Sequence, residues 1–89
     1  MKTLRLARKA QKITQVELAD MLSEKIGRNV SQQQICNYEL DFSLPPLDKL
    51  IALEEVLGID LMQEYHQLIK AGVREKMRLR FKNGRKYYV

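Results

Sequence analysis

Disulfides, membrane spans and export signals are missing from this sequence of 89 residues. Its single cysteine, Cys36, has no partner in the chain, which excludes a disulfide-stabilised scaffold. No run approaches the roughly 18 apolar residues that a membrane-spanning helix needs. Residues 1–5 contain no apolar signal segment. We therefore expect a cytoplasmic protein with no membrane association.

Patterns that indicate catalysis or metal binding are missing as well. His66 is the only histidine, and no cluster of cysteine, histidine or acidic residues at metal-ligand spacing accompanies it. There is no glycine-rich phosphate loop and no serine or cysteine nucleophile beside an evident base. Cys36 is expected to be a small packing residue, because a redox role would need a lowered thiol pKa. The sequence predicts no enzyme, no cofactor and no metal site.

Charge is arranged in three blocks. Residues 1–12 carry a net charge of +5, residues 13–69 carry −7 and residues 70–89 carry +7. An acidic middle between two basic ends indicates a folded body with basic elements at particular edges. We expect one domain over residues 1–69 and a basic extension over residues 70–89.

Apolar spacing and helix-capping patterns predict five helices. The first covers about 4–11, after Thr3, and the next two cover about 15–26 and 32–39. Two capping boxes precede the second and third helices, namely Thr14 with Glu17 and Ser31 with Gln34. Glycines suited to left-handed helix ends follow the second and fourth helices at Gly27 and Gly58.

The second half of the chain is expected to begin with a loop over residues 40–46. Pro46 suits the first position of a fourth helix that ends before Gly58. Asp60 is expected to cap a fifth helix. Its apolar face consists of Leu61, Tyr65, Leu68 and Ile69.

Two interpretations remain open for residues 77–89. Asn83-Gly84 lies between two alternating runs, which favours a β-hairpin that pairs Lys82 with Arg85. Such a hairpin needs a surface to pack on. In the other interpretation the fifth helix continues to about Phe81 and a basic tail follows.

The helices over 15–26 and 32–39 together form a candidate helix-turn-helix. The second of them opens with three glutamines, Gln32-Gln33-Gln34. Glutamine at the start of a helix can form a bidentate pair with the adenine edge in the major groove. A solvated polar face is the alternative explanation for such a run.

An ordered set of short motifs extends from Leu4 to Leu61. It comprises Leu4, Ala7 and Arg8; residues 13–19, ITQVELA; residues 30–35, VSQQQI; Tyr38-Glu39; Pro45, Leu47 and Leu50; and Leu57-Gly58-Ile59. This set resembles the Cro/phage-repressor (XRE-type) helix-turn-helix family. The resemblance implies a mainly α fold, a five-helix lambda-repressor-like DNA-binding domain, to which the C-terminal β-hairpin would be an addition. It also implies a sequence-specific transcriptional regulator, expected to be a repressor that acts as a homodimer on a palindromic operator.

The same resemblance assigns roles to individual residues. Gln32, Gln33 and Asn37 match positions that face base edges, and Gln15 matches a position that holds a DNA phosphate. Arg8 and Glu39 match an ion pair that ties the first helix to the third.

The chain departs from the family pattern at two places. The segment between Leu22 and Val30 is longer than in the compact pattern, and we expect Arg28 and Asn29 within it to reach phosphates. After Glu39 the family often has Asn/Arg-Gly-Lys, whereas residues 40–43 read LDFS and contain no basic residue. The family's basic loop contacts the DNA backbone. We expect the basic extension to make these contacts with DNA phosphates instead, through Arg78, Arg80, Lys82 and Arg85.

A second class of function competes with DNA reading. The same fold could serve as a protein-interaction module, or an antitoxin-like partner protein, with weak or no specific DNA reading. The acidic middle block and the missing basic loop favour this alternative, which requires a protein partner. The glutamine run and the two basic ends oppose it and favour double-stranded DNA as the partner.

Overall fold

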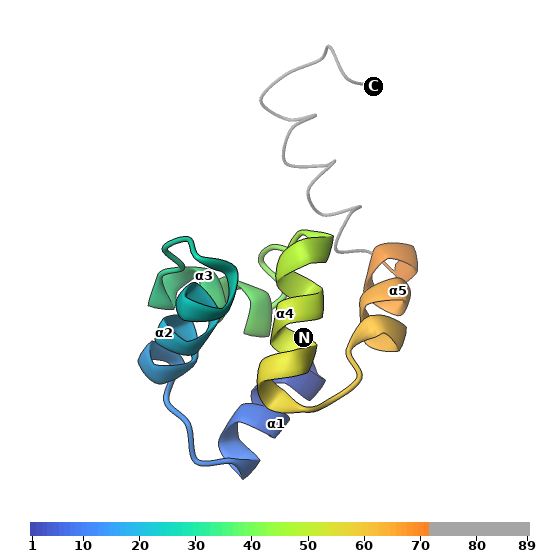
Figure 1. Ribbon diagram of the computed structural model, residues 1–89. Helices are drawn as coiled ribbons and strands as arrows, with labels where there is room; N and C mark the ends of the chain where they lie inside the picture. Colours follow the sequence, from blue (N-terminus) through green and yellow to red (C-terminus); the bar gives the residue numbers. More distant parts are fainter. Residues whose placement is uncertain (72–89) are drawn as a thin grey trace.

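The computed structural model describes residues 1–71, which form five α-helices (Figure 1). They are α1 (Lys2–Ala10), α2 (Gln15–Ile26), α3 (Gln32–Glu39), α4 (Leu47–Leu57) and α5 (Met62–Ala71). The expectation of a mainly α, five-helix domain is confirmed. The expected hairpin or continued helix over residues 77–89 lies outside the described residues.

Both predicted capping boxes are present at the starts of α2 and α3. The Glu17 amide donates to Thr14 Oγ1 at 3.0 Å, and the Thr14 amide donates to Glu17 Oε1 at 2.9 Å. Gln34 and Ser31 exchange the equivalent two bonds, both at 3.2 Å. These local bonds satisfy amides that have no partner inside a helix and so fix where each helix begins.

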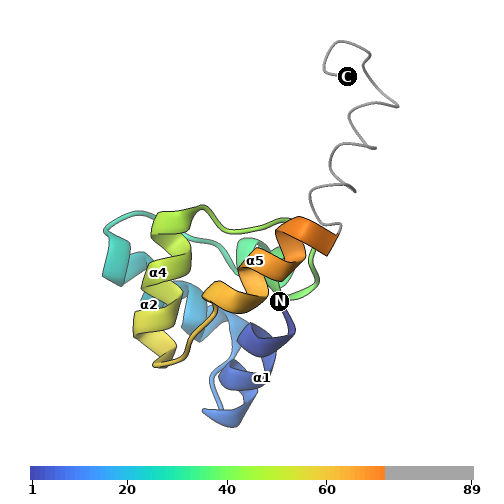
Figure 2. The same ribbon diagram turned by 90° about the vertical axis from the view of Figure 1, so that its right-hand side faces the viewer.

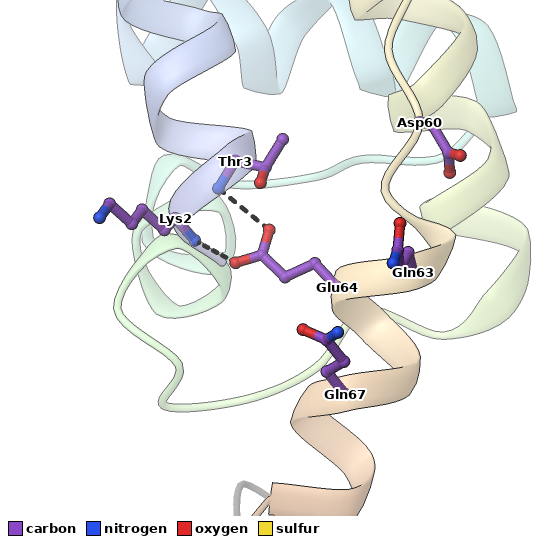
Figure 3. Close-up of a pocket in the computed structure, with 6 residues that line it drawn as sticks. All are labelled: Lys2, Thr3, Asp60, Gln63, Glu64 and Gln67. Atoms are coloured by element: carbon purple, nitrogen blue, oxygen red, sulfur yellow. Dashed lines mark hydrogen bonds between the residues drawn. The ribbon is translucent and has the colours of Figure 1, made fainter.

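Helix α1 begins at Lys2, two residues earlier than predicted, and ends at Ala10. The Thr3 hydroxyl makes no cap. Instead the carboxylate of Glu64 on α5 accepts from the Lys2 amide at 2.8 Å and from the Thr3 amide at 3.0 Å (Figure 3). A negative group at a helix start also interacts favourably with the helix dipole. The start of α1 is therefore set by a residue more than sixty positions away.

Helices α4 and α5 also begin differently from the sequence-based expectation. Pro46 is the residue before α4 and not its first helical residue. Asp60 Oδ1 accepts from the Met62 amide at 2.9 Å, as predicted. A second carboxylate contributes: Glu54 Oε2 accepts from the Leu61 and Met62 amides at 2.8 and 3.1 Å. The last turns of α4 thus hold the start of α5.

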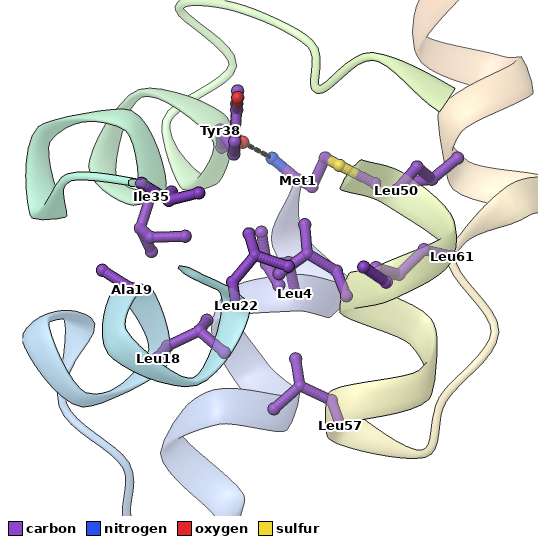
Figure 4. Close-up of a cluster of buried hydrophobic side chains, with 13 residues drawn as sticks. Met1, Leu4, Leu18, Ala19, Leu22, Ile35, Tyr38, Leu50, Leu57 and Leu61 are labelled. Atoms are coloured by element: carbon purple, nitrogen blue, oxygen red, sulfur yellow. Dashed lines mark hydrogen bonds between the residues drawn. The ribbon is translucent and has the colours of Figure 1, made fainter. Parts of the chain in front are cut away.

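The apolar core lies where α2, α3 and α4 meet the start of α1 (Figure 4). Figure 1 shows α4 between α2 and α5, and in the turned view α4 overlaps α2 (Figure 2). The core side chains that are fully buried include Leu4, Leu18, Leu22, Ile35, Leu50, Leu53 and Leu61. Because α3 contributes Ile35 and Tyr38 to this core, its opposite side is left facing solvent.

Met1 joins the core to the end of α3. Its side chain is fully buried, and its ammonium group donates to the Tyr38 carbonyl at 2.6 Å and to the Glu39 carbonyl at 3.1 Å (Figure 4). The same ammonium group contacts the Asp41 carboxylate. Asp41 has a φ of +61°, so the chain turns sharply as it leaves α3.

Candidate nucleic-acid interface

A buried ion pair connects α1 to the last residue of α3. Arg8 Nε lies 2.6 Å from Glu39 Oε2, Arg8 Nη2 lies 3.1 Å from Glu39 Oε1, and the two residues are only 9% and 6% exposed. The hydrogen bonds that Arg8 donates to the Glu39 carboxylate raise the pKa of Arg8 despite the opposing effect of burial. This is the pair that the family resemblance implied, and it is confirmed. It fixes the angle of α3 against α1.

Hydrogen bonds continue from this pair to the surface. Gln15 Nε2 donates to Glu39 Oε1 at 3.0 Å, and Gln32 Nε2 donates to Gln15 Oε1 at 3.3 Å. The first residue of α2 and the first residue of α3 are thereby held together. Gln15 is half-buried, and Gln32 is exposed. No local sequence pattern indicates the contact between Gln15 and Glu39, because the two residues lie 24 positions apart.

Gln33 and Asn37 form a second pair on the exposed side of α3. Gln33 Nε2 donates to Asn37 Oδ1 at 3.0 Å. The two residues are one helical turn apart, as their spacing predicts. Within residues 1–71, no other hydrogen bond engages the side-chain oxygen of Gln33, Oε1, or the side-chain nitrogen of Asn37, Nδ2. The pair therefore presents one acceptor and one donor outward.

The turn between α2 and α3 carries Arg28 and Asn29, and both are exposed. Arg28 forms an ion pair with Asp48 in the first turn of α4. Partial desolvation acts to raise the pKa of Asp48, but hydrogen bonds from the Lys49 amide and the Arg28 guanidinium outweigh it and lower the pKa. Arg28 is thus not a free cation, because it shares its charge with an acidic neighbour.

The loop after α3 contributes no cation to this surface. Asp41 is engaged by the Met1 ammonium group, and Leu40 and Phe42 are 50% and 64% exposed. The basic residues expected to compensate, Arg78, Arg80, Lys82 and Arg85, lie outside the described residues.

Two further features of residues 1–71 concern membranes and metal ions. No helix in this part of the chain is long and apolar enough to cross a membrane. No group of three or more His, Cys, Asp or Glu side chains in the same part could hold a metal ion.

The two capped helices, their connecting turn and the polar face of the second helix define a helix-turn-helix protein. A family model described as "Helix-turn-helix" matches residues 4–62, which is most of the chain. The chain belongs to the Cro/phage-repressor (XRE-type) helix-turn-helix family, a family of DNA-binding regulators. No curated protein matches the chain, and no solved structure matches it.

Proposed function

We propose that this protein is a sequence-specific transcriptional regulator that places α3 in the major groove of double-stranded DNA. Gln32, Gln33 and Asn37 are the proposed base-reading residues. The observation that carries the proposal is the Gln33–Asn37 hydrogen-bonded pair on the solvent-facing side of α3. The buried Arg8–Glu39 pair supports it, because it holds α3 against the rest of the domain.

The outward groups of the pair suit an adenine. In the major groove adenine presents an acceptor, N7, and a donor, the N6 amino group. The side-chain Nδ2 of Asn37 can donate to N7 while the side-chain Oε1 of Gln33 accepts from the N6 amino group. Because the two side chains are already bonded to each other, they lose little conformational freedom on binding.

The start of α2 is the proposed phosphate contact. Gln15 is its first residue, so its backbone amide has no partner inside the helix and is available to a phosphate at the positive end of the helix dipole. Asn29 is exposed in the adjacent turn, and Arg28 would share its charge between Asp48 and a phosphate. We assign the remaining backbone contacts to Arg78, Arg80, Lys82 and Arg85 in a basic extension over residues 70–89 that follows a domain over residues 1–69.

We further propose that the protein acts in the cytoplasm as a homodimeric repressor on a palindromic operator. An eight-residue recognition helix touches only a few base pairs, and a second copy doubles the site that is read. Repression would follow from occupancy of the operator alone.

Enrichment of bound fragments from a pool of random duplexes tests this function. We expect a motif of two adenine-containing half-sites in inverted orientation. Recovery of fragments with no common motif would contradict sequence-specific reading.

One observation favours a second candidate, a protein-interaction module. Leu40 and Phe42 are exposed apolar residues at the place where the family often has a basic loop. This candidate would be supported if the chain enriched no DNA motif from the random pool and bound a protein partner through Phe42.

A further inference from the structure

A groove between α2 and α4 is separate from the proposed DNA-binding residues. It is lined by Met21, Glu24, Lys25 and Val56 and has a volume of about 540 Å³. Three of these residues lie in the second half of α2, whereas Gln15 lies at its start. Met21 is 39% exposed, and Val56 is partly buried against the core. The groove therefore offers an apolar floor to a side chain from outside residues 1–71.

The groove carries both signs of charge, but its acidic groups are the ones left without an ion pair. Glu24 lines the groove and Asp20 lies one helical turn before it on α2; both are exposed and form no ion pair within residues 1–71. Lys25, which also lines the groove, lies 3.5 Å from Glu55 on α4. An occupant that combines positive charge with an apolar side chain fits these properties.

The chain itself contains such a segment. Residues 73–89, which begin two positions after the end of α5, carry seven basic residues and one acidic residue and interleave them with Met77, Leu79 and Phe81. Seventeen extended residues can span up to about 60 Å, which exceeds the dimensions of a domain of this size. We propose that, in the absence of DNA, residues 73–89 dock in the α2–α4 groove of their own chain. An apolar side chain lies between Met21 and Val56, and basic side chains face Asp20 and Glu24.

The docking has a consequence for DNA binding that rests on the proposed function. Arg78, Arg80 and Lys82 are also the residues assigned to DNA phosphates, so the groove and DNA compete for the same basic groups. The apparent affinity for DNA is lowered by the fraction of molecules whose segment is undocked. The acidic face of α2 thus restrains non-specific binding.

Methyl NMR of the full-length chain without DNA tests the docking directly. The chain has four methionines, of which Met21 lines the groove, and Met1 and Met62 lie elsewhere. We expect through-space contacts between the Met21 methyl group and side chains of residues 73–89. Added salt and the substitution Glu24→Gln should both shift the Met21 signal toward an undocked position. The control Asp60→Asn neutralises another exposed carboxylate and should leave the Met21 signal in place.

Two outcomes would overturn the docking. One is a Met21 methyl group with no contact to residues 73–89 and no response to salt or to Glu24→Gln. Another is a contact seen only between differently labelled molecules in a mixed sample, which would make a second copy the occupant. Because no DNA is present, a positive result stands even if the DNA-binding proposal fails.

A binding assay tests the competition separately. The double variant Asp20→Asn/Glu24→Gln should raise affinity for random duplex about threefold or more if most of the free molecules are docked. In a full-length chain that also carries Arg78→Gln, Arg80→Gln and Lys82→Gln, the same double substitution should have a much smaller effect. An equal gain in both backgrounds would show that the added net charge, and not undocking, causes the increase.

Discussion

Four side chains form a line from the interior of the domain to its proposed DNA-binding surface. Arg8 and Glu39 are buried, Gln15 is half-buried and Gln32 is exposed, and each is hydrogen-bonded to the next. The loss of unfolding free energy on removing one of these side chains depends on how deeply that side chain is buried. A buried charge that loses its partner is strongly unfavourable, whereas an exposed amide can bond to water.

Glu39→Ala should therefore be strongly destabilising. It leaves the Arg8 guanidinium buried without a counter-charge, which costs about 3–5 kcal/mol of unfolding free energy. Urea unfolding measures the loss. Glu55→Ala is a matched control, because it breaks an ion pair whose side chains are 47% and 57% exposed and should cost at most about 1 kcal/mol. Equal losses in the two variants would contradict the role of the buried pair.

Gln33→Ala should act on binding and leave stability almost unchanged. The variant removes the acceptor proposed to meet adenine, so affinity for the enriched site should fall by about 1–3 kcal/mol. Affinity for random duplex should change little, because Gln33 is not assigned to a phosphate. Titration of both duplexes at one salt concentration gives the comparison. An equal loss on the two would show that Gln33 does not read a base.

Helix ends show which parts of the fold were predictable from the sequence. Both capping boxes join residues three positions apart, so the starts of α2 and α3 could be predicted correctly. The start of α5 is held by the predicted local cap, Asp60, and also by Glu54, whereas the start of α1 is held by Glu64. No local pattern identifies Glu54 or Glu64 as a cap, and the sequence-based start of α1 is therefore wrong by two residues.

The two capping boxes differ in charge, which gives a pH-dependent prediction. Hydrogen bonds from the Thr14 amide and hydroxyl group lower the pKa of Glu17 from its usual value of 4.5. A carboxyl group with a lowered pKa in the folded state stabilises the fold above its unfolded-state pKa, and this stabilisation is lost as the pH falls through the folded-state pKa.

Glu17→Gln should accordingly lower the melting temperature at pH 7 and have little effect at pH 3. Glutamine keeps the cap's hydrogen bond, as Gln34 does in α3, but not the charge. Thermal unfolding across this pH range measures the difference between wild type and variant. A difference that stays constant down to pH 3 would show that the Glu17 charge does not stabilise the fold.

Glu64→Ala should loosen the contact between α5 and α1. It removes the carboxylate that accepts from the Lys2 and Thr3 amides, and loss of such a cap costs roughly 1 kcal/mol. Gln67→Ala is the control, because Gln67 lines the same pocket between α1 and α5 as Glu64, but its side chain makes no hydrogen bond to α1 in the described part of the chain (Figure 3). Equal melting temperatures for the two variants would contradict the capping role.

Across the whole molecule, three surfaces differ in charge and polarity. The exposed amides of α3, the α2–α4 groove and the apolar residues Leu40 and Phe42 lie on different elements. The family and its five helices could be predicted from ordered motifs. The hydrogen bonds that link Gln15 to Glu39 and Met1 to Tyr38 could not, because they depend on how distant elements pack.

The proposed function depends on α3 reading a DNA sequence. The most direct test measures the affinity of the full-length protein for its enriched site and for a shuffled duplex over a range of salt concentrations. Both affinities should fall as salt rises, because phosphate contacts release counterions. At physiological salt the enriched site should still bind at least about 10³-fold more tightly. A ratio close to one at every salt concentration would contradict the proposed function.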